Sequence, residues 1–171
     1  GFSQTHNVSI QNGTETSHYR ASFGQSSNKG VFPNEELSRT NIDLNAGTEL
    51  NKYLSMDGKL SLSRTKATDR PEYGNYGAIN QLMGIPNNIR LDDLKQDEDH
   101  VHVNWHGPSA GVRNPYYVLH QRHNSDERWR AFGYYNAKIN FTDWLHFSAK
   151  YAFDYYRTRI ESTNAGDGIN N

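Results

Sequence analysis

The sequence lacks features that define several common classes of protein. It has no cysteine, which leaves the cellular compartment open. It has no run of about 18 apolar residues, so no transmembrane helix is expected. The formal net charge of −1 provides no basic field for nucleic acid. Neither a signal peptide nor an initiator methionine is present, and we expect the chain to be an internal piece of a longer protein.

Hydrophobic residues are scarce, whereas aromatic residues are not. Hydrophobic residues make up 34% of the chain, against the roughly 45–50% apolar share, glycine included, of soluble domains. Aromatic residues nevertheless reach 12%, and a disordered chain is poor in aromatics. The chain is therefore expected to fold, but without an ordinary soluble core.

Apolar and polar residues alternate with the period of two that is typical of β-strands. In the third such run, Ile42, Leu44 and Ala46 share one face, while Asn41 and Asp43 share the other. The pattern predicts six strands, at residues 5–11, 16–25, 40–50, 53–64, 128–141 and 145–160. Most of them exceed the about 5–6 residues of an average soluble strand and approach or pass the about 9–11 that cross a bilayer.

The connections alternate between short turns and long loops. Turn-forming residues occupy 12–15, 51–52 and 142–144, whereas 26–38 and 65–127 are long. In an up-and-down sheet, this order places all short turns at one end, as in outer-membrane barrels. The expected fold class is all-β: an antiparallel up-and-down transmembrane β-barrel, of which about six strands form a sector. A soluble β-sandwich with one wet face is the alternative.

Aromatic residues are expected to form two girdles where the strands meet the lipid headgroups. One group lies near the short turns and the other toward the long loops. The first comprises Tyr53, Phe141, Trp144 and Phe147. The second comprises Trp129, Tyr151, Phe153 and Tyr155.

Six short stretches carry motifs that follow one another in a recognisable order. They are 5–15 (THNVSIQNGTE), 19–25 (YRASFGQ), 39–45 (RTNIDLN), 53–61 (YLSMDGKLS), 114–117 (NPYY) and 142–145 (TDWL). In this order they resemble strand, turn and loop motifs of the SusC/RagA family of TonB-linked outer-membrane transporters. Gln25 and Tyr53 depart from the family pattern, which often has an aromatic residue and a tryptophan there.

The resemblance implies a fold, a location and a set of partners. Such proteins are barrels of twenty-two strands with an N-terminal plug in the outer membrane of Gram-negative bacteria. They import oligosaccharides or peptides with energy from TonB, beneath a SusD-like lipoprotein that acts as a lid. This chain would be an early-to-middle barrel segment without the plug. The alternatives are a non-transport barrel or adhesin whose loops bind a partner, and a soluble β-sheet binding domain.

The 65–127 loop holds aromatic residues that are candidates for contact with a substrate or a lid. They are Tyr73, Tyr76, Trp105, Tyr116 and Tyr117. Alternatively, these rings pack the loop against its neighbours. A loop of this length rarely lacks structure of its own, and a short helix is expected at 77–83 with a further helical turn at 91–94.

Four basic residues on the polar sides of the predicted strands are candidates for lining the barrel interior. They are Arg20, Arg130, Lys138 and Lys150. They would tune which solutes pass, or pair with neighbouring acids.

No catalytic residue, cofactor or metal is predicted, and the chain is expected not to be an enzyme. No Ser-His-Asp or Cys-His arrangement can be assigned by spacing, and no phosphate-binding glycine loop is present. The pair Asp92–Asp93 would need a pocket in order to act as catalytic acids. His100 and His102 would share a strand face, but their spacing matches no zinc signature.

Overall fold

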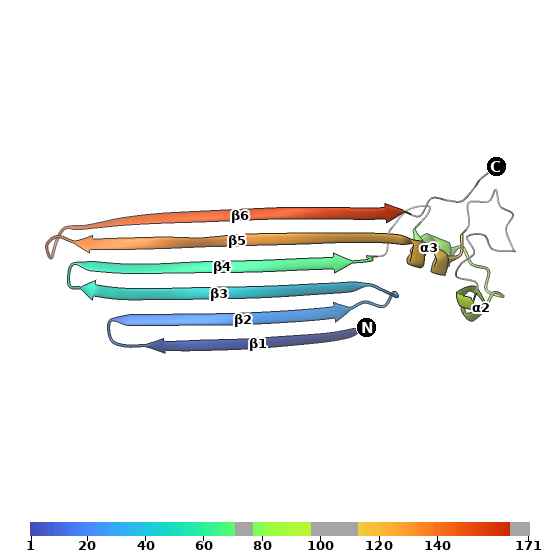
Figure 1. Cartoon of the computed structure of the whole chain (residues 1–171), viewed down its shortest axis with the longest axis horizontal. Coiled ribbons are helices and arrows are strands. Elements are labelled where there is room, and N and C mark those ends of the chain that lie inside the picture. Colours follow the sequence, from blue (N-terminus) through green and yellow to red (C-terminus); the bar gives the residue numbers. More distant parts are fainter. Residues whose placement is uncertain (71–76, 97–112, 165–171) are drawn as a thin grey trace.

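The protein forms one antiparallel sheet with three short helices at one end (Figure 1). It is described here from a computed structural model that covers residues 1–70, 77–96 and 113–164. The strands are β1 (Phe2–Gly13), β2 (Ser17–Lys29), β3 (Glu36–Asn51), β4 (Leu54–Thr68), β5 (Arg122–Asn140) and β6 (His146–Asn164). The helices, all between β4 and β5, are α1 (Ala78–Met83), α2 (Leu91–Gln96) and α3 (Pro115–Gln121). Each strand pairs with the next in the chain, so the predicted all-β, six-stranded, up-and-down arrangement is confirmed.

The three hairpin turns lie together at the end of the sheet away from the helices (Figure 1). Each turn is held by a side-chain oxygen that accepts backbone N–H bonds. Asn51 Oδ1 accepts from Tyr53 N at 2.8 Å and from Leu54 N at 3.0 Å. The hydroxyls of Thr14 and Thr142 each accept from the backbone N–H three residues later, at 3.1 and 3.0 Å. The turn residues recognised in the sequence thus set the positions of all three hairpins.

The connections at the other end are shorter than the sequence predicted. β2 continues to Lys29 and β3 begins at Glu36, so only residues 30–35 lie outside the strands, and the expected loop at 26–38 is wrong. The loop predicted at 65–127 is likewise reduced to 69–121. The successive ladder pairs Ser26↔Arg39 and Ser27↔Ser38 lie on opposite faces of the sheet, and both consist of polar residues. The alternation is therefore absent there, although the backbone pairing continues.

The strand register gathers the alternating apolar residues of all six strands on one face, called here the apolar face. One row of cross-strand neighbours runs through Ile10, Ala21, Leu44, Leu60, Gly133 and Phe153. The adjacent row runs through Val8, Phe23, Ile42, Leu62, Ala131 and Tyr155. The opposite face, called the polar face, carries the intervening residues, among them Arg20, Asn45 and Lys59. A shift of one residue in any ladder would mix the two faces.

Exposure on the two faces is the reverse of that in a soluble sheet, which buries its apolar face. Leu44 is 44% exposed and Leu62 is 37% exposed, while Ser61, on the polar face between Leu60 and Leu62, is only 5% exposed. On β3, Asn41 and Asp43 are half-buried, whereas Ile42 between them is exposed. On the central strands β3 and β4 the sheet therefore shields short polar side chains and presents apolar ones, whereas both faces of the edge strands β1 and β6 are exposed.

No second layer covers the sheet within the described ranges. The helices lie beyond the ends of the strands rather than over a face (Figure 1). Buried hydrophobic side chains in these ranges are Ala67, Ala78, Leu94 and Val118, three of which belong to helices. β1 and β6 form the two edges of the sheet, which is open rather than closed into a ring.

The helices contain six or seven residues each. None of the helices in the described part of the chain is long and apolar enough to cross a membrane.

The aromatic residues near the hairpin turns lie as expected, but the second group does not form a single line. Trp129 pairs with Arg64 and Arg157 beyond the last apolar row. Tyr151 instead pairs with Tyr135, three rows nearer to the hairpin turns. Tyr151, Phe153 and Tyr155 follow one another at intervals of two residues on β6, so they occupy successive rows and cannot form one line across the strands.

Replacement of Asn51 by alanine is expected to lower the free energy of unfolding by about 1 kcal/mol, because two backbone N–H groups of the β3–β4 turn lose their acceptor. The measurement is urea-induced unfolding followed by tryptophan fluorescence. Asn41→Ala removes the same amide from a β3 position whose side chain forms no hydrogen bond with the described residues. Equal losses in the two variants would contradict the role given to Asn51.

Candidate functional site

The four basic residues predicted to line an interior all lie on the polar face. Arg130 donates two hydrogen bonds to Asp154, at 2.9 and 2.6 Å, and its guanidinium lies 4.8 Å from the centre of the Phe132 ring. Both partners of this ion pair are about half exposed, so solvent screens the pair and its contribution to stability is small. Its effect is to fix the guanidinium over the polar face.

The other three basic residues lie on the same face, and one of them, Lys150, contacts Tyr134. The Lys150 ammonium lies 4.3 Å from the centre of the Tyr134 ring, and Tyr134 pairs with Lys59 across the β4–β5 ladder. Arg20, on β2, lies in the same row as Lys59 and is three strands from Tyr134. Lys138 lies nearer to the hairpin turns, between Ser55 and Ser148.

Amide and carboxylate groups fill the spaces between these cations. Asn136 Nδ2 donates to Asp57 Oδ1 at 2.7 Å, and the Ser61 hydroxyl donates to Asp43. Together with the rings of Tyr134 and Phe132, they give the polar face both stacking surfaces and hydrogen-bonding groups. Such a surface suits polar solutes with flat apolar faces, as sugars and peptides have. The sequence interpretation missed Phe132, although its position between Arg130 and Tyr134 follows the same alternation.

The three helices form a small cluster whose centre is polar. Asn114 is 1% exposed. Its side chain accepts from Tyr116 N at 3.0 Å and donates to the carbonyl oxygen of Leu94 at 2.8 Å, so it caps α3 and ties it to α2. Gln81 of α1 accepts from the backbone N–H of Arg113 at 2.7 Å. The NPYY motif thus has a structural basis, because an N-cap asparagine is followed by a proline in the first turn.

Two of the five candidate aromatic residues of the loop lie in α3. Tyr116 and Tyr117 are half-buried. Tyr116 lines an apolar cavity of about 120 Å³ together with Phe32, Leu82 and Leu91. Tyr73, Tyr76 and Trp105 lie outside the described residues. The helices predicted at 77–83 and 91–94 occur at Ala78–Met83 and Leu91–Gln96, and α3 was not predicted.

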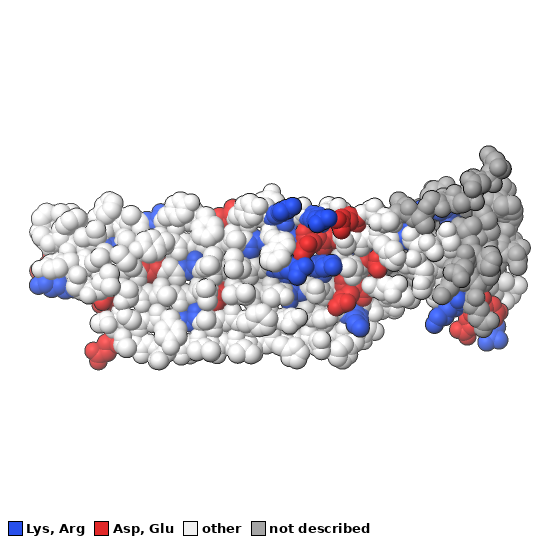
Figure 2. Space-filling model, viewed as in Figure 1, with Lys and Arg blue, Asp and Glu red and all other residues white. Residues whose placement is uncertain are grey.

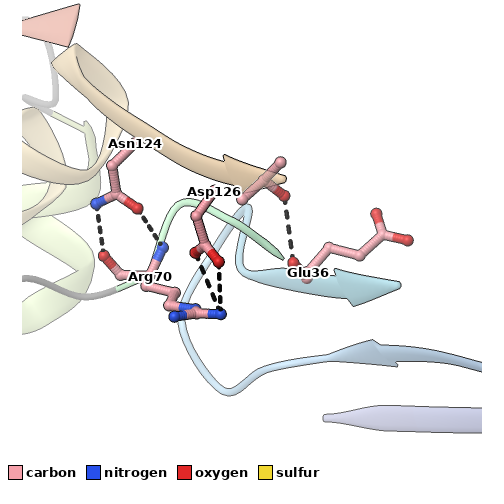
Figure 3. Close-up of polar contacts among 5 residues, drawn as sticks. Glu36, Arg70, Asn124 and Asp126 are labelled. Atoms are coloured by element: carbon pink, nitrogen blue, oxygen red, sulfur yellow. Dashed lines mark hydrogen bonds and ion pairs between the residues drawn. The ribbon is translucent and has the colours of Figure 1, made fainter. Parts of the chain in front are cut away.

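A set of polar contacts holds the two ends of the 69–121 connection together (Figure 3). The Asn124 side chain accepts from Arg70 N at 3.1 Å and donates to Arg70 O at 2.9 Å. The Arg70 guanidinium pairs with Asp126 at 3.1 Å, and His123 Nδ1 lies 3.1 Å from Asp69 Oδ1. We call these five residues the loop clamp. No sequence signal identifies it, because its two halves lie more than fifty residues apart.

The apolar face carries a shallow groove of about 800 Å³. Small residues such as Ala46 and Gly58 form its floor, and Tyr19, Tyr151 and Phe153 stand at its sides. The groove is almost wholly apolar, which suits a hydrocarbon chain rather than a polar solute.

Metal-binding residues are not grouped in the part of the chain that the structure describes: no three His, Asp or Glu side chains there could hold one ion. His100 and His102, the pair considered from the sequence, lie outside that part.

No protein-family profile matches this chain, and no curated protein matches it.

Replacement of Asn114 by alanine is expected to destabilise the helical cluster by about 2 kcal/mol, because a buried carbonyl and the first turn of α3 both lose a partner. Limited proteolysis should then cut within 77–121 while the sheet stays intact. Asn88→Ala, at an exposed position between α1 and α2, is the matched control. Equal resistance of the two variants would rule out the capping role.

Proposed function

We propose that the chain is a wall segment of an outer-membrane β-barrel, with its apolar face against lipid and its polar face toward a watery interior. The main support is the reversed exposure of the sheet, in which Leu44 and Leu62 are exposed and Ser61 is shielded. An apolar face of this extent is not stable in water and needs a cover. Lipid would cover the apolar face and leave the polar face accessible to solutes.

The dimensions of the sheet agree with this proposal. On β4 the apolar face runs from Leu54 to Leu62, nine residues, and about 9–11 tilted residues cross a bilayer. Lipid offers no hydrogen-bond partners, so the free edges of β1 and β6 would pair with further strands of a closed barrel. The hairpin turns would face the periplasm, and the helices would face the exterior.

Within this frame we propose that the protein imports oligosaccharides or peptides. The order of motifs resembling SusC/RagA transporters supports this, as does the combination of rings and hydrogen-bonding groups around Tyr134 and Arg130. The proposed partners are TonB, acting through a plug, and a SusD-like surface lipoprotein above the helical cluster. A non-transport barrel or adhesin would share the lipid-facing wall but would not move solutes.

Single cysteines at two adjacent positions of β3 test the membrane proposal, because the chain has no cysteine of its own. In lipid vesicles, Asn45→Cys is expected to react with a membrane-impermeant maleimide, since Asn45 lies on the polar face. Leu44→Cys, on the apolar face, should react only after denaturation. Labelling of Leu44→Cys at the rate of Asn45→Cys would place this face in water and contradict the membrane proposal.

Transport is tested by growth. Cells that lack the protein are expected to lose growth on one class of oligosaccharide or peptide supplied as the sole carbon source, and cells without TonB should show the same loss. Restoration by the wild-type gene is the control. Unchanged growth on every glycan and peptide, combined with lipid-protected Leu44→Cys, would instead favour the adhesin alternative.

A further inference from the structure

The apolar face ends abruptly at a charged surface on its helix-bearing side. Beyond Leu62, β4 continues on the same face with Arg64 and Lys66, and beyond Tyr155, β6 continues with Arg157 and Arg159. These four residues are called here the cation belt. Figure 2 shows charged side chains gathered over this part of the sheet, right of centre, with far fewer elsewhere on the same face.

The signs of the charges change with distance from the apolar rows. The first row beyond Leu62 holds Arg64 and Arg157, which flank Trp129. The second row holds Lys66 and Arg159 with one acid, Glu127, between them. The third row brings in Glu36 and Glu161. Cations therefore lie nearest to the apolar rows, and acids lie farther out.

The acids neutralise only part of the cation belt. Arg64 Nε lies 2.5 Å from Glu127 Oε1, and Arg159 pairs with Glu161. Across the described residues, no carboxylate lies within ion-pair distance of Lys66 or Arg157. The Arg64 guanidinium also lies 5.1 Å from the centre of the Trp129 ring, which holds it at the edge of the apolar rows. Lys66 and Arg157 thus form no ion pair with a described carboxylate, although Lys66 lies opposite Glu127 and attracts it.

The apolar groove begins close below the cation belt. Phe153, at its side, precedes Arg157 by four residues on β6, a distance of about 13 Å along a strand. A molecule that covered both sites would need an anionic end and a hydrocarbon chain. Phosphate is an anion that Arg and Lys bind through charge-assisted hydrogen bonds, and basic residues at a membrane surface attract anionic headgroups.

We infer that the cation belt and the apolar groove together bind a lipid whose headgroup carries a phosphate monoester. Lys66 and Arg157 contact the phosphate, Trp129 lies at the headgroup level, and an acyl chain lies in the groove. This inference rests on the proposed membrane function and deepens it, since it assigns a lipid class to one face at the exterior side.

The test uses the protein at its natural length in neutral detergent, titrated with phosphatidic acid and, separately, with phosphatidylcholine, with native mass spectrometry to count bound lipid. Lys66→Gln combined with Arg157→Gln is expected to weaken phosphatidic acid binding about 25-fold, about fivefold for each cation. Arg39→Gln combined with Arg128→Gln makes the same charge change at the same end of the polar face and should change binding little. Equal weakening by both pairs would overturn the assignment.

The groove is tested separately. Ala46→Leu fills its floor and should weaken phosphatidic acid binding, while Ala137→Leu, on the same face outside the groove, should not. Glycerol 3-phosphate and inorganic phosphate carry the anion without a chain and should compete poorly. Full competition by either would assign the belt to a soluble anion and overturn the inference.

Unfolding temperatures in the same detergent identify any variant that fails to fold, and Arg157→Lys, which keeps the charge, should retain most of the binding. The outcomes that contradict this lipid-binding inference differ from those that contradict the proposed function. Lipid-protected Leu44→Cys with unaltered lipid binding by the Lys66 and Arg157 variant overturns only this inference. Water-exposed Leu44→Cys overturns the membrane proposal itself.

Discussion

The backbone ladder that joins all six strands is the interaction on which every other feature depends. Each strand is paired with its chain neighbour over nearly its whole length, from β1↔β2 to β5↔β6. Because side chains alternate along a strand, this register alone sorts the residues into an apolar and a polar face. It also decides which residues share a row, and so it places Arg64, Trp129 and Arg157 side by side although they come from three strands.

Apolar side chains stabilise this sheet only if something outside the described residues covers them. A soluble domain gains most of its stability from a buried core, but here the few buried hydrophobic residues include Ala78, Leu94 and Val118 of the helices. The strands hold one another through hydrogen bonds, while the apolar face stays exposed in the described part of the chain. The polar face, by contrast, satisfies some of its own polar groups, since Arg130 and Asp57 form hydrogen bonds with other residues of that face.

The two ends of the sheet are held by different kinds of contact, local at the hairpin turns and long-range at the helices. The hairpin turns are local, and a single oxygen such as Asn51 Oδ1 is enough to close one. The 69–121 connection needs long-range support instead, which the loop clamp supplies at its base and Asn114 supplies within the helical cluster. These contacts place Tyr116 near the end of the strands, where the proposed lid and substrate would approach.

The sequence by itself determined the strands, their order and their hairpin turns, because alternation and turn chemistry are local. It also pointed to Arg20, Arg130, Lys138 and Lys150 as one set, since the period of two keeps such residues on one side. It failed at Ser26–Lys29, where both faces are polar and only pairing with 36–39 makes a strand. Only the tertiary structure decided the loop clamp and the belt of cations beside the groove. These depend on register between strands far apart in the chain, and no local pattern encodes that register.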